Sequence, residues 1–472
     1  MAAIDENAAA LGVPRSKLME SSGNAIARAV RDLAAPDDRV VCCAGRGNNG
    51  GDAFAAARFL SAYDVEVWLL GRPGSIRTEI ARENWAALEH AEIPRRVIRD
   101  SREIEPPEAD VVVDALLGTG ISGDPREPAA SMIRAIEDAD ATVVSVDVPS
   151  GLDGETGTPG EPTVTPDRVV TFHDEKPGLP ELAARVTVAD IGIPSAAETV
   201  IGPGDRRLVR RETREARVMV VGGGPYAGAP ALAARAALRA GAELAFVAAP
   251  DAIADEIQTG APDLIVQPFA GEHLQPAHVP ELVETAHRYD DVVVLGPGLG
   301  THEETLDAVG RFLESFEGPT VVDADALAVV PEVDPAGTLV CTPNPRELAL
   351  LGGPDGLDDP GEYPEAVATV ATDLGQVVLA KGPVDVVSDG DRTRRNRTGS
   401  PGMAVGGSGD VLAGVVATLL DGAEPMDAAG VGAYVNGLAG ERLAESDGTG
   451  FLASDLADAI PRSLWKERPL DQ

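Results

Sequence analysis

Apolar and polar positions along the chain alternate between short apolar runs and longer stretches with helical spacing. The short runs predict strands at Arg39–Ala44, Val65–Leu70, Arg95–Ile98, Asp110–Ala115 and Thr142–Val146. Helical spacing predicts one or two helices between Ala9 and Ala35, and further helices at Thr78–His90 and Pro128–Asp138. Because strands and helices alternate, this part of the chain is expected to form a doubly wound parallel sheet covered on both faces.

The same alternation resumes after a junction that is rich in glycine, proline and charge, Gly202 to Arg214. Strands are predicted at Arg217–Val221, Glu243–Ala248, Asp263–Gln267, Asp291–Leu295, Thr320–Val322, Thr338–Cys341 and Val377–Ala380, and helices at Ala229–Ala240 and Val411–Leu420. We therefore expect two α/β domains, residues 1–204 and 205–472. Aromatic residues make up only 3% of the chain, so both cores must be built from Val, Ala and Leu, with closely packed helices.

Composition narrows the possible partners and the location. The chain carries 77 acidic and 39 basic side chains, a net charge of −38, which disfavours nucleic acid. The acids are scattered, and arginine replaces lysine at all but four basic positions, as in a halophile's surface. Three cysteines, two of them adjacent in a predicted strand, fit buried thiols in a reducing compartment. Because the chain has no long apolar run, we expect it to stay out of membranes and to be cytoplasmic. We also expect a homo-oligomer.

A glycine-rich loop, Gly45 to Asp52, follows the first strand and precedes a helix that is expected from Ala53 onward. Its spacing satisfies G-x-G-x-x-G, which indicates either a phosphate site at a helix N-terminus or only a tight turn with positive φ angles. Asn48, Asn49 and Asp52 add amide and carboxylate groups that a simple turn does not need. They favour a site that also holds polar groups or a cation.

Acids also stand at the ends of two later strands. Asp114 opens a second glycine-rich loop that runs to Asp124, and Asp147 opens the segment that contains Ser150. Each acid taken singly could be a helix cap, but the carboxyl ends of parallel strands converge on one edge of the sheet. Asn49, Asp114 and Ser150 could then form an oxygen cage for a weakly hydrated cation. Such a small charge count suits potassium better than magnesium, and leaves Asp147 for proton transfer.

Four loops in the second half carry chemical groups: residues 296–300, 342–347, 381–385 and 406–414. In the last, glycines precede a helix, so that backbone N–H groups could hold an anion while Asp410 accepts a hydroxyl proton. Asp410 could instead cap its own helix. Lys381 is either a compact charge beside phosphates or a chance lysine.

The N-terminal motifs resemble a known family. GRGNNGGD, VDALLGTGISGD and SVDVPSGLDGETG, followed by Lys176-Pro177-Gly178 and DIGIP, are similar to the NAD(P)H-hydrate epimerase domain, which has a Rossmann-like sheet. The resemblance implies that Asn49, Asp114 and Ser150 bind K⁺ and that Asp147 is catalytic. It also implies contacts to the hydrated nucleotide from Asn48, Asn49, Gly50, Gly51, Asp52, Gly118, Thr119, Gly120, Ile121, Ser122, Gly123, Asp124 and Asp147.

The second half, through GGGPYAGAP, LRAGAEL, LGPGLG, TPNPREL, AKG and GGSGDVLAG, resembles the ribokinase-like ADP/ATP-dependent NAD(P)H-hydrate dehydratases. The resemblance implies that the hydrated nucleotide meets Ala229, Gly298, Asn344 and catalytic Asp410, and that ADP with Mg²⁺ meets Lys381, Gly382, Pro383, Val384, Asp385 and Gly409. One departure is Asn344, because this position is usually histidine in the family. Asparagine keeps a hydrogen bond but loses the titrating group, which puts any proton role there in doubt.

Together the two resemblances imply a repair enzyme for hydrated nicotinamide nucleotides, NADHX and NADPHX. One domain would interconvert the R and S hydrates, and the other would dehydrate the S form at the expense of ADP, releasing AMP and phosphate. A nicotinamide-dependent dehydrogenase, with Asp64 or Glu66 on the ribose, explains only the first loop. A kinase of a vitamin or sugar alcohol, with a non-catalytic nucleotide-binding N-terminal domain, explains only the second half. A silent scaffold domain is the non-enzymatic alternative.

Overall fold

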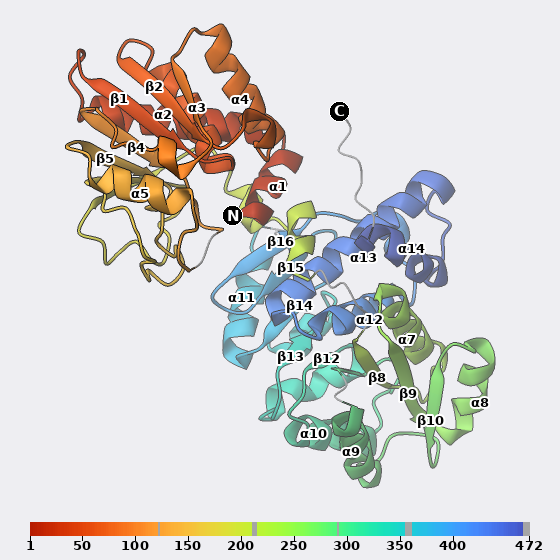
Figure 1. The fold of residues 1–472 in the computed structure, drawn as a ribbon. Coiled ribbons are helices and arrows are strands. Elements are labelled where there is room, and N and C mark those ends of the chain that lie inside the picture. The colour runs from red at the N-terminus through yellow and green to blue at the C-terminus, as the bar shows by residue number, and fades with distance from the viewer. Residues whose placement is uncertain (121–122, 210–214, 290–291, 355–360, 466–472) are drawn as a thin grey trace. The chain divides into compact units, whose positions relative to one another are not determined.

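The protein is described here from a computed structural model that covers residues 1–120, 123–209, 215–289, 292–354 and 361–465 (Figure 1). The chain forms two compact units. The N-terminal unit is Leu11–Pro194, and the C-terminal unit combines Met1–Ala10 with the chain from Ser195 onward. Within the described ranges, no helix is both long enough and apolar enough to cross a membrane.

The N-terminal unit is built on a seven-stranded sheet in the order β3-β2-β1-β4-β5-β6-β7, with every neighbouring pair parallel. Its strands are β1 (Arg39–Ala44), β2 (Asp64–Leu70), β3 (Arg95–Ile98), β4 (Val111–Ala115), β5 (Thr142–Val146), β6 (Arg168–Phe172) and β7 (Arg185–Ala189). Its helices are α2 (Arg15–Arg31), α3 (Asn48–Phe59), α4 (Glu79–His90) and α5 (Ala129–Glu137). This is the Rossmann strand order, so the predicted doubly wound class is confirmed.

The order of the strands places the N-terminal site. From β1 the chain moves outward through α3 to β2, whereas from β4 it moves the other way through α5 to β5. Right-handed crossovers therefore put α3 and α5 on opposite faces. Met132, Ile133 and Ile136 of α5 pack on Val41 and Cys43 of β1, and all are fully buried. The loops after β1 and β4 diverge at this switch point, where open α/β sheets bind ligands.

The first glycine-rich loop differs from the expectation. Helix α3 begins at Asn48, so Gly50 and Gly51 lie in its first turn and not in a loop before Ala53. The expected positive φ angles are also wrong, since Gly45, Gly47, Gly50 and Gly51 are all outside that region. A Cβ on Gly50 would lie 2.1 Å from the Gly45 carbonyl oxygen. Glycine is required here because the backbone segments approach each other closely.

The C-terminal unit contains a nine-stranded sheet in the order β10-β9-β8-β11-β12-β13-β14-β15-β16 (Figure 1). Its strands are β8 (Arg217–Val221), β9 (Leu244–Pro250), β10 (Ile265–Phe269), β11 (Val292–Leu295), β12 (Thr320–Val322), β13 (Leu339–Cys341), β14 (Val377–Ala380), β15 (Asp385–Ser388) and β16 (Thr393–Asn396). Strands β10 to β14 pair in parallel, and β15 and β16 add an antiparallel hairpin. The expected α/β class is confirmed, although the sequence pattern missed β15 and β16.

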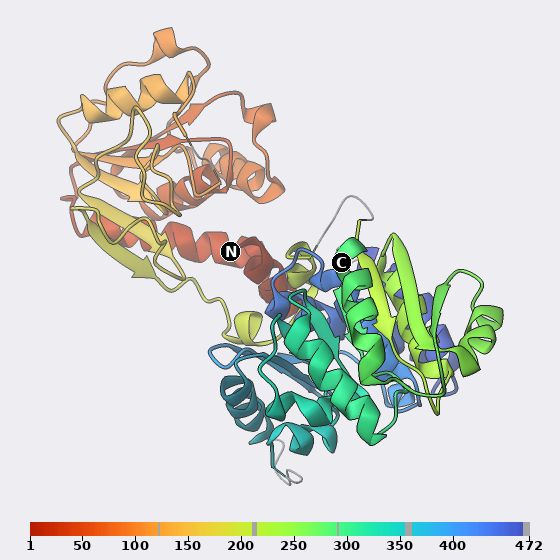
Figure 2. The same cartoon turned by 90° about the horizontal axis from the view of Figure 1, so that it is seen from below.

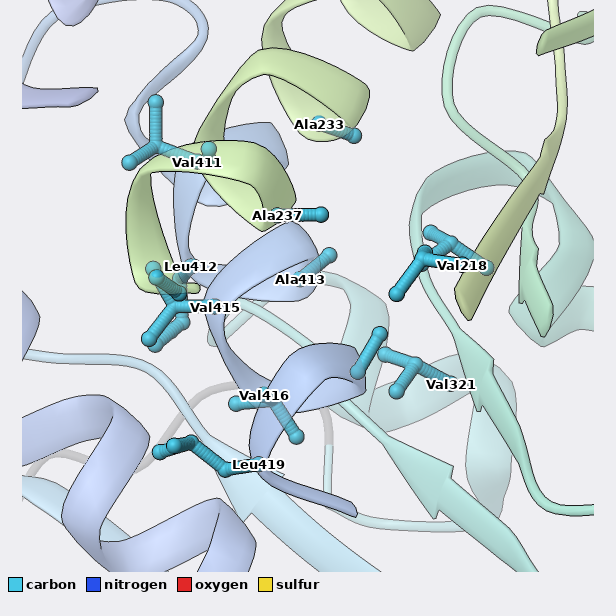
Figure 3. Close-up of a cluster of buried hydrophobic side chains, with 14 of the residues drawn as sticks. Val218, Ala233, Ala237, Val321, Val411, Leu412, Ala413, Val415, Val416 and Leu419 are labelled. Carbon is cyan, nitrogen blue, oxygen red and sulfur yellow. The ribbon is translucent and has the colours of Figure 1, made fainter. Parts of the chain in front are cut away.

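Helices cover the C-terminal sheet, and small side chains let them pack closely. They are α1 (Ala2–Ala10), α6 (Ala196–Thr199), α7 (Gly228–Ala240), α8 (Asp251–Gly260), α9 (Val279–Tyr289), α10 (Glu303–Ser315), α11 (Tyr363–Leu374), α12 (Ser408–Leu420), α13 (Pro425–Asp447) and α14 (Ala453–Trp465). Figure 3 shows α12 against α7, with Ala237 close to Ala413. A Cβ on Gly414 would lie 2.0 Å from the Ala233 carbonyl oxygen. The predicted close packing of Val, Ala and Leu is confirmed.

The chain's first helix packs with the C-terminal unit. Asn7 on α1 donates to the Ala197 carbonyl oxygen at 3.1 Å and to Asp205 Oδ2 at 2.9 Å. Figure 2 shows this red helix beside the yellow-green segment that begins the C-terminal unit. The compact units therefore divide near residues 10 and 194, whereas the domain limits 1–204 and 205–472 remain a prediction from the motifs.

Candidate active sites

In the N-terminal unit, Asn49 connects the loop after β4 to the end of β5. Its side-chain nitrogen donates to the Leu117 carbonyl oxygen at 2.8 Å and to the Val146 carbonyl oxygen at 2.9 Å. Leu117 follows β4 and Val146 ends β5. Both amide protons are used, and the side-chain oxygen accepts no hydrogen bond from the residues that the structure describes, so it can serve a ligand as an acceptor.

Asp114 and Ser150 are in direct contact and fully buried. Asp114 Oδ1 accepts a hydrogen bond from the Ser150 hydroxyl at 2.5 Å, and Oδ2 accepts from the Ser150 N–H and the Ser145 hydroxyl, both at 2.8 Å. Burial raises the pKa of Asp114, and these hydrogen bonds oppose the increase. The Ser150 oxygen also accepts from the Leu117 N–H at 3.0 Å, so the three predicted cage residues share one neighbourhood.

Asp147 lies at the end of β5 with an unusual backbone and a firm side-chain contact. Its φ angle is +65°, a conformation that costs a non-glycine residue energy and that clusters at functional sites. Its Oδ1 lies 2.9 Å from Lys176 Nζ and 3.1 Å from the Thr171 hydroxyl. The Asp147 side chain is 17% exposed, so it reaches solvent from a largely enclosed position.

The remaining N-terminal site residues occupy the rim of this network. Asn48 is exposed, whereas Gly50, Gly51 and Asp52 are buried in the first turn of α3. Gly118 lies beside Asn49, since a Cβ on it would be 3.5 Å from Asn49 Cγ. Thr119, Gly120 and Gly123 are exposed, and Asp124 accepts a hydrogen bond from the Glu161 N–H at 2.9 Å. Ile121 and Ser122 lie outside the described residues.

In the C-terminal unit, a lysine and three acids gather at the carboxyl edge of the sheet. Lys381, after β14, places Nζ 2.7 Å from Asp323 Oδ1 and 3.9 Å from Glu347 Oε2. Burial lowers the pKa of Lys381, but the carboxylates of Asp323 and Glu347 outweigh it, so the net pKa is raised. Asp323 is 2% exposed and also accepts from the Thr342 hydroxyl at 2.8 Å.

Asp410 lies in the first turn of α12. The helix starts at Ser408, three residues earlier than expected, after Gly407 at a φ of +95°. Burial and the neighbouring Asp323 carboxylate raise the pKa of Asp410 to about 7, against the opposing effect of Lys381. A carboxyl group with this pKa can both accept and release a proton near neutral pH.

The two residues expected to meet the substrate at this edge, Ala229 and Gly298, are neighbours. A Cβ on Gly298, whose φ is +73°, would lie 3.3 Å from Ala229 Cβ and 2.5 Å from the Tyr226 carbonyl oxygen. Only glycine therefore fits between these two loops. Gly409 lies beside Lys381, since a Cβ on it would be 3.1 Å from Nζ, and this proximity links the start of α12 to the lysine.

Asn344 has a local structural role. Its side-chain oxygen accepts hydrogen bonds from the N–H groups of Arg346 at 2.9 Å and Glu347 at 3.0 Å. Its own N–H donates to Glu347 Oε2 at 2.8 Å, which completes a reciprocal cap. The asparagine therefore positions Glu347 beside Lys381.

The loop from Lys381 to Asp385 is a tight turn between β14 and β15. The Gly382 N–H donates to Asp385 Oδ1 at 2.9 Å, and Asn396 donates to Asp385 Oδ2 at 3.0 Å. Burial raises the pKa of Asp385. Pro383 and Val384 at the tip are exposed and available to a ligand, whereas the Asp385 carboxylate is already engaged.

Three charged residues of these sites were not among the predicted site residues. Lys176 and Glu347 stand within the family-like motifs Lys176-Pro177-Gly178 and TPNPREL, and Lys176 is one of only four lysines. Asp323 directly follows β12 and could have been found as another acid at a strand end.

Comparison with known proteins agrees with this geometry. A family model described as NAD(P)H-hydrate dehydratase matches residues 218–462, and one described as YjeF-related protein N-terminus matches residues 15–178. The bifunctional NAD(P)H-hydrate repair enzyme Nnr of Methanothermobacter thermautotrophicus is 42% identical over 98% of this chain and 93% of its own. That of Pyrobaculum aerophilum is also 42% identical, over 98% of this chain and 96% of its own.

Together these matches define a two-part α/β enzyme with one site in each unit. The chain belongs to the family of bifunctional NAD(P)H-hydrate repair enzymes. A solved structure of an ADP/ATP-dependent NAD(P)H-hydrate dehydratase from Bacillus subtilis covers 55% of this chain and 96% of its own, with 24% identity and a TM-score of 0.47.

Proposed function

We propose that this protein repairs hydrated nicotinamide nucleotides, with R/S epimerisation in the N-terminal unit and ADP-dependent dehydration of the S hydrate in the C-terminal unit. The observation that carries this proposal is the presence of a separate acid–base centre, Asp147 or Asp410, at the carboxyl edge of each sheet. A dehydrogenase explains neither the centre at Asp410 nor the membership of the repair-enzyme family. A kinase with a silent first domain explains neither the ion pair of Asp147 with Lys176 nor the family match of residues 15–178.

In the N-terminal unit, the reacting bond is that between C6 of the reduced ring and its hydroxyl oxygen. The ring nitrogen supplies the electron pair as this bond breaks, and Asp147 gives the hydroxyl a proton so that it leaves as water. Water then adds to either face and returns a proton to Asp147, which restores the starting state. Asn48 and the first turn of α3 would bind the nucleotide phosphates through N–H groups and the helix dipole.

In the C-terminal unit, Asp410 would take the proton of the S hydroxyl as its oxygen attacks the terminal phosphorus of ADP, releasing AMP. The phosphorylated oxygen then leaves as phosphate, and loss of a proton from C5 restores the double bond. The start of α12 and Lys381 would stabilise the charge on the transferred group.

Two metal ions are part of the proposal. The Asn49 side-chain oxygen accepts no hydrogen bond from the described residues, and both Asn49 and buried Ser150, which contacts Asp114, bond to Leu117. These oxygens fit K⁺, which would offset the negative charge of Asp114 and shape the glycine-rich loop. In the C-terminal unit, three acids surround one lysine, and Asp323 and Glu347 are oxygen ligands suited to Mg²⁺. That ion would neutralise phosphate charge. We also propose the cytoplasm as the location and a homo-oligomer as the assembly.

A single assay tests the proposed function. Purified protein is added to a mixture of R and S NADH hydrate, and recovery of dihydronicotinamide absorbance is followed with and without ADP. We expect complete recovery with ADP, and R/S interconversion alone, seen by chromatography, without it. Formation of a stable phosphorylated product in place of NADH would favour the kinase, and absence of any interconversion would favour the silent scaffold domain.

A further inference from the structure

We propose that Lys176 is the positioning residue for Asp147, holding one carboxylate oxygen so that the other faces the reacting hydroxyl. The inference rests on the proposed role of Asp147. Lys176 Nζ lies 2.9 Å from Asp147 Oδ1, 2.9 Å from the Phe172 carbonyl oxygen and 3.2 Å from the Asp174 carbonyl oxygen. The ammonium group donates hydrogen bonds to the two carbonyl oxygens and forms an ion pair with the Asp147 carboxylate.

Lys176 is held by its own segment of the chain as well as by Asp147. Phe172 ends β6, and the two carbonyl groups belong to the turn that leads from this strand to Lys176. The ammonium group is therefore fixed by backbone atoms, and the Lys176 residue is only 7% exposed. A donor fixed in this way sets the direction of the carboxylate that it contacts, while it is too enclosed to serve as a substrate contact itself.

The contact selects one oxygen of Asp147. Both polar contacts, from Lys176 and from the Thr171 hydroxyl, fall on Oδ1. Among the described residues, Oδ2 makes no hydrogen bond or ion pair. Since the backbone of Asp147 is also held at a φ of +65°, the side chain is fixed at both ends and Oδ2 is left to carry the proton.

The residue type supports the same conclusion. Only four of the 39 basic side chains are lysine, so this chain uses arginine almost everywhere else. Lys17 is exposed, whereas Lys176 and Lys381 are both largely shielded and pair with strand-end acids. A planar guanidinium cannot direct three protons to oxygens grouped around one nitrogen, but an ammonium can. An ammonium group therefore suits a position where one compact charge meets three oxygen atoms.

The test is a double-mutant cycle in the full-length protein, with R to S interconversion of NADH hydrate measured without ADP. We expect Lys176→Met to lower kcat about 100-fold while KM changes less, because a misdirected acid–base group affects the chemical step. In the Asp147→Asn background, Lys176→Met should cause no further loss, since the lysine acts through the aspartate. Lys17→Met, which removes an exposed lysine, is the matched control and should match wild type.

Two outcomes would overturn the inference. One is an unchanged kcat in Lys176→Met, and the other is losses from the two single substitutions that multiply in the double variant. If Lys176→Met does not fold, Lys176→Arg takes its place. This variant should keep the circular dichroism spectrum and the KM of wild type. Its kcat should fall at least about 10-fold, because the planar guanidinium group of arginine misaligns the Asp147 carboxylate. An unchanged kcat in Lys176→Arg would then reject the inference. If Asp147→Asn itself retains interconversion, it is the proposed role of Asp147 that fails.

Discussion

At the scale of single residues, Asp410 determines how the dehydratase reaction should depend on pH. Burial and Asp323 raise its pKa to about 7, and only the ionised form can accept the hydroxyl proton. We predict that kcat/KM for ADP-dependent dehydration falls below a midpoint near pH 7, and that Asp410→Asn abolishes dehydration while R/S interconversion continues. Dehydration that survives in Asp410→Asn would assign the proton transfer to another group.

The same carboxyl group predicts a gain in stability when it is removed. Its folded pKa, about 7, lies above the ordinary aspartate value of 3.8, so the folded state binds the proton more tightly. That stabilisation is present at low pH and is lost as pH rises from about 4 to about 7. Asp410→Asn should therefore melt higher than wild type at pH 8, with a smaller gain at pH 5. The control is Asp334→Asn, which removes the carboxylate of an exposed acid and should leave the melting temperature close to that of wild type.

Asp114 allows a direct test of the potassium proposal. Removing the buried carboxylate in Asp114→Ala should raise KM for the hydrate in the epimerase assay, lower kcat less, and abolish any response to K⁺. Ser145→Ala is the matched control, because it removes a hydrogen bond to Asp114 but no proposed ligand. Equal activation by Na⁺ and Li⁺, or a K⁺ response that persists in Asp114→Ala, would reject the cage.

The sequence could predict proximity only for residues at the ends of predicted strands. Asn49 and Ser150 follow β1 and β5, and Asp114 lies near the end of β4. The apolar runs of these three strands are clear, and the structure joins the three residues through Leu117. Lys176 could not be placed in the same way, because it follows β6, which the pattern of apolar residues did not single out. Its contact with Asp147 depends on the pairing of β5 with β6, which spacing alone does not specify.

At the scale of elements, the limits of the helices were less predictable than their existence. Helices α3 and α12 both begin earlier than expected, at Asn48 and Ser408. Glycine and serine are weak helix formers, so local preference places the start later in each segment. Tertiary contact outweighs that preference, since Gly50 approaches Gly45 and Gly407 packs beside Leu232. The earlier starts bring Gly50, Gly51 and Gly409 into the first turns, where free N–H groups lie.

The contact between α7 and α12 should not tolerate a single added methyl group. A Cβ on Gly414 would lie 2.0 Å from the Ala233 carbonyl oxygen, so the helices must separate to accept it. We predict that Gly414→Ala destabilises the protein by at least about 1–3 kcal/mol, as overpacking does, despite the better helix propensity of alanine. Gly260→Ala, at an open position on α8, should be neutral or slightly stabilising in the same melting experiment. Equal melting temperatures for the two variants would show that the contact can relax.

At the scale of the whole molecule, the alternation of strands and helices predicted two α/β sheets but not that α1 packs with the C-terminal unit. Given the strand order, right-handed crossovers account for the faces on which α3 and α5 lie. No sequence pattern showed where helix α1 packs, because the helix has no strong apolar face and is attached through polar contacts. Asp205 receives hydrogen bonds from Asn7 and, at 2.9 Å to each oxygen, from Arg394 on β16. Local sequence cannot show a contact between residues so distant along the chain.

This attachment predicts that the first ten residues stabilise the C-terminal unit. Asn7 is 3% exposed, and its side-chain oxygen also accepts the Gly204 N–H at 2.9 Å, so Asn7→Ala would leave buried polar groups without partners. Such a loss costs about 1–3 kcal/mol for each group. Heating Asn7→Ala before assay should therefore inactivate dehydration at a lower temperature than in wild type, while epimerisation is lost at the wild-type temperature.

The matched control lies on the same helix. Glu6 pairs with Arg207 at 2.7 Å, but the Arg207 side chain is 50% exposed, so Glu6→Gln should change stability by less than about 1 kcal/mol. If Asn7→Ala lowers the inactivation temperature of epimerisation and leaves dehydration unchanged, α1 stabilises the N-terminal unit instead. If neither activity responds, the cluster around Asp205 holds without Asn7, because Arg394 and the Gly202 N–H, 2.7 Å from Oδ2, already satisfy the carboxylate.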